Sequence, residues 1–171
     1  ADPVLRVCSV RLLREKEPEA LLEHAGRLLR VPHDQVRYAV CELLAERGSE
    51  IHAAALAELV RDPGVSRNPN VVRIRAAQAL ARCGDATSLD ALAPHASSGN
   101  ARNGLTRIAI DAVLSIAQRH REARATAFEV LVNAFPQPPA VGDGEGAARE
   151  VRAVTTLARH VHGRLAALTG Q

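Results

Sequence analysis

Apolar positions recur with a helical period along most of the chain. The clearest stripe steps by three and four residues: Val36, Ala39, Val40, Leu43 and Leu44. Because an α-helix turns once every 3.6 residues, this spacing gathers the apolar side chains on one face. A second, shorter stripe follows the break at Gly48-Ser49. The pattern therefore predicts two helices joined by a tight turn.

The same alternation of stripes and breaks continues over the rest of the sequence. Pro18 is predicted to begin a helix, and Asp34 and Asn70 are predicted to cap helix starts. Gly48 and Gly84 are predicted to end helices in the left-handed conformation. The predicted helices span residues 3–15, 18–31, 35–47, 50–61, 70–83, 86–96, 104–119, 122–135 and 147–168.

Arginines mark a longer repeat. Five of them recur near the start of a predicted helix, four directly after an apolar residue and Arg107 after Thr106: Arg6, Arg37, Arg73, Arg107 and Arg152. Their separations are 31, 36, 34 and 45 residues, and the last falls to 34 when the 11-residue Pro- and Gly-rich segment 136–146 is set aside. Each repeat holds two helices and cannot bury its apolar face alone, whereas stacked repeats share one core. The repeat therefore predicts an all-α solenoid.

The segment from Val72 to Asp85 resembles a HEAT repeat of the phycobilisome-lyase-like type. That pattern runs Val-Arg, two variable residues, Ala-Ala, one variable, Ala-Leu-Gly, one variable, Leu-Gly-Asp, and Ala81 and Cys83 depart from it here. The resemblance implies a right-handed α-solenoid of about four to five helical hairpins, with the Val-Arg helices lining the concave face. Residues 1–171 are expected to form a single domain with a flexible loop at 136–146. Since the chain starts at an inner helix, we expect either a segment of a longer solenoid or a solenoid that lacks its N-terminal cap.

Composition and charge argue against several classes of fold and function. The 22 Lys and Arg residues exceed the 19 Asp and Glu residues by only three, and no block of like charge occurs. Aromatic residues make up 2% of the chain, which argues against β-rich folds and against stacking on single-stranded nucleic acid. Three cysteines without a paired spacing predict reduced thiols, and hence a cytoplasmic protein. No apolar run is long enough to predict a membrane span.

The sequence offers no pattern for catalysis or metal binding. The seven histidines are scattered, and His160 and His162 lie on different sides of a helix at their spacing. No nucleophile elbow or phosphate-binding loop occurs. No catalytic residue, metal or cofactor is therefore predicted. Asp111, at an otherwise apolar helical position, is expected to pair with one of the recurring arginines, with a catalytic acid as the alternative.

The five recurring arginines have two interpretations. A fixed position in each repeat is what a structural ladder requires, with each guanidinium bound to an acid or carbonyl of a neighbouring repeat. The alternative is a row of cations for phosphate or carboxylate ligands. We expect the structural ladder.

Outward-facing residues of the inner helices are the predicted binding surface for a protein or peptide partner. They are Arg11, Tyr38, Glu42, Arg75, Gln78 and Arg82. Tyrosine and arginine are enriched at interface hot spots, which fits this function; a merely solvated helix face is the equal alternative. The alternative is a nucleic-acid-binding module that uses Arg11, Arg14, Arg75, Arg82 and loop arginines. A lyase-type enzyme subunit is suggested by the repeat type alone.

Overall fold

The computed structural model describes residues 3–64, 66–97, 103–136 and 145–170, and within these ranges every regular element is a helix. The α-helices are α1 (Pro3–Lys16), α2 (Pro18–Glu23), α3 (Ala25–Leu28), α4 (Asp34–Arg47), α5 (Ala53–Arg61), α6 (Pro69–Cys83), α7 (Leu89–Ala96), α8 (Gly104–Arg119), α9 (Arg124–Asn133) and α10 (Glu145–Thr169). Three short 3-10 turns, η1 (Glu50–His52), η2 (Ala86–Ser88) and η3 (Arg121–Ala123), precede α5, α7 and α9.

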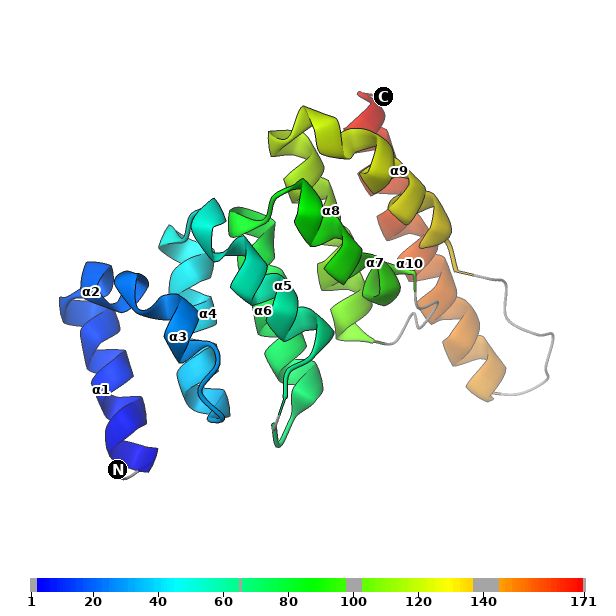
Figure 1. Cartoon of the computed structure of the whole chain (residues 1–171). Coiled ribbons are helices and arrows are strands. Elements are labelled where there is room, and N and C mark those ends of the chain that lie inside the picture. Colours follow the sequence, from blue (N-terminus) through cyan, green and yellow to red (C-terminus); the bar gives the residue numbers. More distant parts are fainter. Residues whose placement is uncertain (1–2, 65, 98–102, 137–144, 171) are drawn as a thin grey trace.

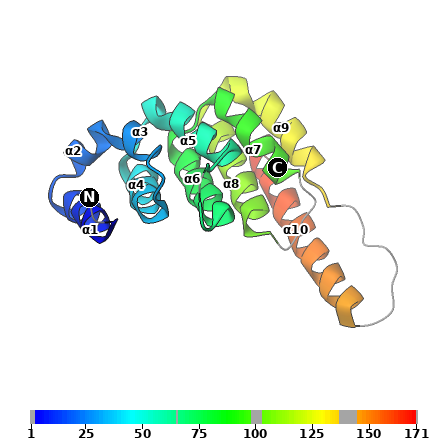
Figure 2. The same cartoon turned by 60° about the horizontal axis from the view of Figure 1, so that its bottom comes forward.

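The helices form two rows. One row contains α1, α4, α6, α8 and α10, each packed against the next, and the other contains α2, α3, α5, α7 and α9. Figure 2 shows the chain as an arch with the first row on its concave side. We call this row the inner row and the other the outer row. The prediction of an all-α solenoid built from helical hairpins is confirmed.

The predicted helix starts need two corrections. Asn68, not Asn70, is the N-cap of α6, because its side chain accepts a hydrogen bond from the backbone N–H of Val71 and Pro69 takes the first helical position. Asp34 is the first residue of α4 and not its cap. Its carboxylate instead binds the next loop, where it accepts from Ser66 Oγ at 3.0 Å.

The predicted left-handed glycines are also wrong. Gly48 has φ −66° and Gly84 has φ −67°, both in the extended region that any residue adopts. These glycines are needed for space. A Cβ on Gly84 would lie 2.6 Å from Ile116 Cδ1, and one on Gly48 would overlap Cys83 Sγ. They let the ends of α4 and α6 pack closely against α6 and α8, respectively.

The three thiols differ in their surroundings. Cys8 is exposed on α1, whereas Cys41 and Cys83 are buried in the core. Burial raises the pKa of Cys41 to about 12 and that of Cys83 to about 11. Cys83 Sγ also donates to the Leu44 carbonyl of the preceding inner helix at 3.2 Å. All three cysteines are free.

We therefore expect one fast thiol per chain. The thiolate is the reactive form, and at pH 8 the buried pair remains almost wholly protonated. Titration with a chromogenic disulfide reagent at pH 8 should release one equivalent quickly from the native protein and three after denaturation. The variant Cys8→Ser should lose the fast equivalent. Two or more fast equivalents in the native wild type would contradict the buried positions of Cys41 and Cys83.

Candidate functional site

A groove of about 800 Å³ runs along the inner row between α1, α4 and α6. We call it the inner-face groove. Its lining residues are Arg11, Arg14, Glu15, Gln35, Tyr38, Ala39, Glu42, Leu43, Glu46, Arg47, Val71 and Arg75. Successive inner helices supply them because α4 packs against both α1 and α6.

Ion pairs cross this groove from both sides. Arg14 NH1 lies 2.6 Å from Glu42 Oε2, and Arg14 NH2 lies 2.5 Å from Glu46 Oε1. From the other side, Arg75 NH2 approaches Glu42 Oε1 at 3.7 Å. Two carboxylates of α4 therefore balance the nearest cations of α1 and α6. The groove presents charges of both signs instead of a single positive field.

Tyr38 supplies the aromatic side chain of the groove and is half-buried. Burial raises the pKa of its phenol above the usual value, and the carboxylate of Asp34 acts in the same direction. The cations Arg75 and Arg37 oppose this shift without reversing it. The phenol therefore stays protonated at neutral pH, with a flat apolar ring and a hydroxyl that can donate and accept hydrogen bonds.

The predicted binding residues divide into two groups. Arg11, Tyr38, Glu42 and Arg75 all line the inner-face groove, and Gln78 accepts a hydrogen bond from Arg75 NH1 at 3.3 Å. Arg82 lies elsewhere, at the end of α6. Among the lining residues outside this set, Arg14 forms two ion pairs across the groove, whereas the sequence pattern placed it only in the nucleic-acid alternative. Its partners Glu42 and Glu46 lie one helical turn apart on α4. This spacing of two carboxylates is the sequence signal that could have indicated a cationic partner for them.

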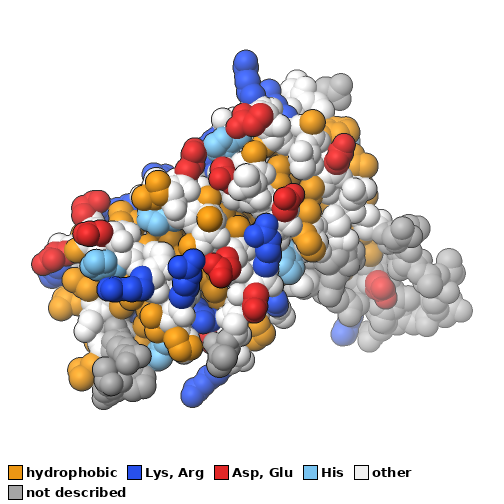
Figure 3. All heavy atoms as spheres, in the orientation of Figure 1, with side chains coloured by type: hydrophobic (Ala, Val, Ile, Leu, Met, Phe, Trp, Pro, Cys, Tyr) orange, Lys and Arg blue, Asp and Glu red, His pale blue; other side chains and the backbone are white. Residues whose placement is uncertain are grey.

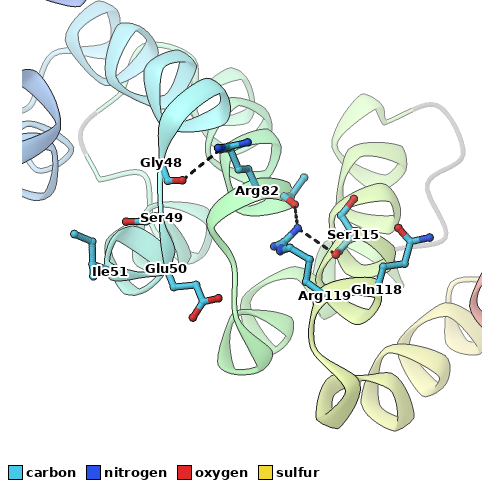
Figure 4. Close-up of a pocket in the computed structure, with 9 residues that line it drawn as sticks. Gly48, Ser49, Glu50, Ile51, Arg82, Ser115, Gln118 and Arg119 are labelled. Carbon is cyan, nitrogen blue, oxygen red and sulfur yellow. Dashed lines mark hydrogen bonds between the residues drawn. The ribbon is translucent and has the colours of Figure 1, made fainter. Parts of the chain in front are cut away.

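Arg82 belongs to a second pocket, at the carboxyl ends of the inner helices. Figure 4 shows the guanidinium of Arg82 directed toward Gly48, whose carbonyl oxygen accepts from Nε at 3.3 Å. Arg119 binds the Ala81 carbonyl, the Ser115 carbonyl at 3.1 Å and the Gly84 carbonyl at 2.9 Å.

These two arginines act as caps. The last carbonyls of a helix have no partner within the helix and carry partial negative charge, which a guanidinium from the next inner helix satisfies. Burial lowers the pKa of Arg119 below its usual value. Most of its donors are bound to backbone carbonyls, so this pocket is less suited than the inner-face groove to hold a ligand.

The five recurring arginines are not equivalent. Arg37 is buried, and it donates to the Val31 carbonyl at 2.8 Å and to the Pro63 carbonyl. Arg73 donates to the Val60 carbonyl at 3.1 Å. Both therefore bind backbone carbonyls at the ends of outer-row helices or in the adjoining loops. Arg107 and Arg152 are exposed, and the side chain of Arg6 lies outside the described part of α1.

The structure also fixes the register between inner helices. The last hydrogen bonds of α4, α6 and α8 are donated by the backbone N–H groups of Gly48, Gly84 and His120. They go to the carbonyls of Leu44, Leu80 and Ile116, respectively. These carbonyls are 36 residues apart, as are Arg37 and Arg73. The matching position in α8 is Ala109, so Arg107 lies two residues away from it. In the sequence, the 34-residue spacing between Arg73 and Arg107 looks like one regular repeat, so it does not reveal this shift of two residues.

Asp111 pairs with the last helix, not with a recurring arginine as expected. Its Oδ1 lies 2.7 Å from Arg164 NH2 and 3.1 Å from His160 Nε2. Both partners are on α10, which packs against α8 and α9. The carboxylate therefore fixes α10 to the inner row.

The variant Asp111→Asn should loosen α10 modestly. Asp111 and Arg164 are each about one-third exposed, so solvent screens the pair, and we expect a loss of about 1 kcal/mol in unfolding free energy. Hydrogen exchange should report faster exchange in α10 than in α4 or α6. The control Asp90→Asn removes an exposed carboxylate from α7 and should leave exchange unchanged. Equal protection of α10 in both variants would contradict this role.

The described ranges contain no group of three His, Cys, Asp or Glu side chains placed to hold a metal ion. They also contain no helix with the length and apolar character needed to cross a membrane.

Comparison with known proteins gave one match. A family model described as HEAT repeats matches residues 27–113. The matched segment covers α4, α5, α6 and α7 and most of α8. No curated protein and no solved structure matches the chain.

Proposed function

Because the chain belongs to the HEAT-repeat family, we propose that it is a non-enzymatic module that binds a protein or peptide in its inner-face groove. Proteins of this family typically act as interaction scaffolds, and stacked repeats provide extended concave surfaces. The observation that carries the proposal is the convergence of Arg11, Tyr38, Glu42 and Arg75 from three successive inner helices on one groove.

The chemistry of the groove fits a polypeptide. A peptide carries donors and acceptors on every residue and side chains of both charges, and the groove offers both signs together with a protonated phenol. Glu46 and Arg75 remain 56% and 42% exposed in their ion pairs, so a ligand can reach and exchange these partners. Tyrosine and arginine also provide large contact areas when a partner covers them.

Nucleic acid is disfavoured by the same ion pairs. Binding to phosphate requires arginines that are free to pair with it, whereas Arg14 and Arg75 already pair with a carboxylate of α4. On the face drawn in Figure 3, basic and acidic side chains are interspersed over the outer helices instead of forming one basic patch.

The three free cysteines support a reducing compartment, and we place the protein in the cytoplasm.

A comparative capture experiment tests the proposal. The wild-type chain and the double variant Tyr38→Ala/Arg75→Ala are immobilised, exposed to the same native lysate, and the bound proteins are identified and then titrated individually. At least one protein should bind the wild type and lose affinity about tenfold or more with the double variant. The control Arg121→Ala removes an exposed arginine of η3 and should bind as the wild type does.

Two results would overturn the proposal. One is an identical set of partners and affinities for the wild type and the double variant. The other is binding of a labelled DNA or RNA duplex at about 50 mM salt that weakens steeply as salt rises and depends on Arg11 and Arg75. The second result would establish the nucleic-acid function.

A further inference from the structure

The inner-face groove continues into a second pocket at the amino end of α4. This pocket has a volume of about 640 Å³ and is formed by residues 32–35 and by residues 66–68 of the loop before α6. Gln35 and Tyr38 line both the groove and this pocket. The two therefore form one continuous surface along α4, with Tyr38 at the junction. We call it the extended groove.

Two arginines of the extended groove are free to bind a ligand. The carboxylates of α4 already hold Arg14 and Arg75. By contrast, Arg11 on α1 and Arg67 in the loop before α6 are exposed, and within the described residues no hydrogen bond or ion pair engages either guanidinium. Arg11 lines the groove and Arg67 lines the second pocket. A free cation therefore lies in each part, with Tyr38 shared between them.

The backbone that carries Arg67 is held in place. Asp34 Oδ2 accepts from the Arg67 backbone N–H at 2.9 Å and from Ser66 Oγ at 3.0 Å. Ser66 Oγ in turn accepts from the Asn68 N–H at 3.1 Å. Buried Arg37 lies 3.9 Å from Asp34 Oδ1 and offsets the charge of this carboxylate. Arg67 is thus presented from a fixed loop, which reduces the entropy lost when a ligand binds.

The spacing of the two free arginines fits a short extended peptide. The hydrogen bonds at the helix ends match α1 to α4 at an offset of 31 residues and α4 to α6 at an offset of 36, so Arg11 is level with Glu42 and Arg67 with Val31. This difference is about 16 Å along the helix axes. Because α1 and α6 are two inner-helix spacings of about 8–10 Å apart, the two Cα atoms lie roughly 25 Å from each other. An extended peptide of about seven residues spans this distance.

We propose that the ligand of the extended groove is an acidic peptide in an extended conformation. Two of its carboxylates, about five to seven positions apart, bind Arg11 and Arg67, and an apolar side chain between them packs on the ring of Tyr38. Guanidinium groups bind carboxylates through paired hydrogen bonds, whereas a basic peptide would place its cations against both arginines. This proposal rests on the groove function proposed above and names the class of peptide.

Selection from a displayed library of random peptides of about nine residues tests the ligand class. The wild-type chain is the target at about 150 mM salt, and the double variant Tyr38→Ala/Arg75→Ala is the counter-target. The selected sequences should be enriched in pairs of Asp or Glu about five to seven positions apart. Basic or uncharged sequences that bind only the wild type would overturn this inference and leave the groove function standing. No sequence that prefers the wild type would count against both.

Charge reversal tests the two contacts with one selected peptide. Arg11→Glu and Arg67→Glu should each weaken its binding about fivefold or more, because each variant places a carboxylate against a carboxylate. The control Arg121→Glu makes the same change in net charge at an exposed site of η3 and should bind as the wild type does. Equal weakening by all three variants would show unspecific attraction and would overturn the proposed contacts. Circular dichroism checks that the variants keep the helical fold.

A charge swap separates direct contact from an indirect effect. The peptide in which lysine replaces the acid that faces Arg67 should bind Arg67→Glu more tightly than it binds the wild type, a result that a disturbed loop would not produce. A swapped peptide that prefers the wild type would refute this contact. Displacement of the acidic peptide by an equal concentration of oligothymidylate at about 150 mM salt would also overturn the proposal, in favour of nucleic acid.

Glu15 supplies a variant with the opposite effect. It lines the groove one helical turn after Arg11, is exposed, and forms no ion pair within the described residues. Its charge opposes an acidic ligand at Arg11, so Glu15→Gln should bind the selected peptide about twofold to threefold more tightly. Weaker binding by Glu15→Gln would contradict a carboxylate of the ligand at this end of the groove.

Discussion

Gly84→Ala should lower the free energy of unfolding by about 3 kcal/mol, and Gly48→Ala should have a similar effect. Replacing a glycine whose φ is near −66° with alanine ordinarily stabilises a protein slightly, because it restricts the unfolded chain. Here the added methyl has no space. The Cβ at residue 84 would lie 2.6 Å from both Ile116 Cδ1 and the Leu80 carbonyl oxygen.

The loss arises because the neighbour cannot move away freely. Ile116 is fully buried in α8, and its displacement would separate α8 from the end of α6. Leu80 O is backbone and already accepts the last helical hydrogen bond of α6 from Gly84 N at 2.8 Å. The contact surface between successive inner helices would therefore open, and each repeat depends on this surface for stability.

Gly163→Ala is the matched control. Gly163 lies inside α10, and a Cβ there would meet no atom within 4 Å. This variant should be more stable than the wild type by about 0.5–1 kcal/mol, because alanine favours the helix. Urea unfolding followed by circular dichroism measures all three variants. If Gly84→Ala were as stable as Gly163→Ala, the close approach of α6 and α8 would be refuted.

The helices themselves were predictable from local information. The 3.6-residue period of apolar positions depends only on neighbouring residues, and each predicted range contains helix in the structure. The outer helices are less regular than predicted. The range 18–31 breaks at His24, where φ −98° and ψ 0° leave the helical region. Their irregular starts depend on how each outer helix meets the inner row, which the local pattern does not encode.

Contacts between repeats were harder to predict. The role of Gly48 depends on Cys83, 35 residues later, and the ion pair of Arg14 depends on the rotation of α4 relative to α1. The arginine register failed for a related reason. Arg107 follows Arg73 by nearly one repeat, but only the hydrogen bonds at the helix ends show that the true interval is 36 residues.

Arg37→Ala should lower the free energy of unfolding by about 3 kcal/mol. The Arg37 side chain is 5% exposed and binds two segments at once, through the carbonyls of Val31 and Pro63. Its removal would leave both carbonyls without this donor and Asp34, 3.9 Å away, without a buried counter-charge. Unfolding in urea, with the wild type as reference, gives the loss directly.

The conservative variant Arg37→Lys distinguishes charge from geometry. A lysine keeps the positive charge near Asp34, but its single ammonium does not reproduce the planar fork that reaches both carbonyls. We therefore expect Arg37→Lys to lose at least half of the stability that Arg37→Ala loses. Arg107→Ala, at the exposed arginine two residues out of register, should change stability by less than about 0.5 kcal/mol. Equal losses for Arg37→Ala and Arg107→Ala would show that charge alone, and not the buried fork, explains the recurrence of arginine in these repeats.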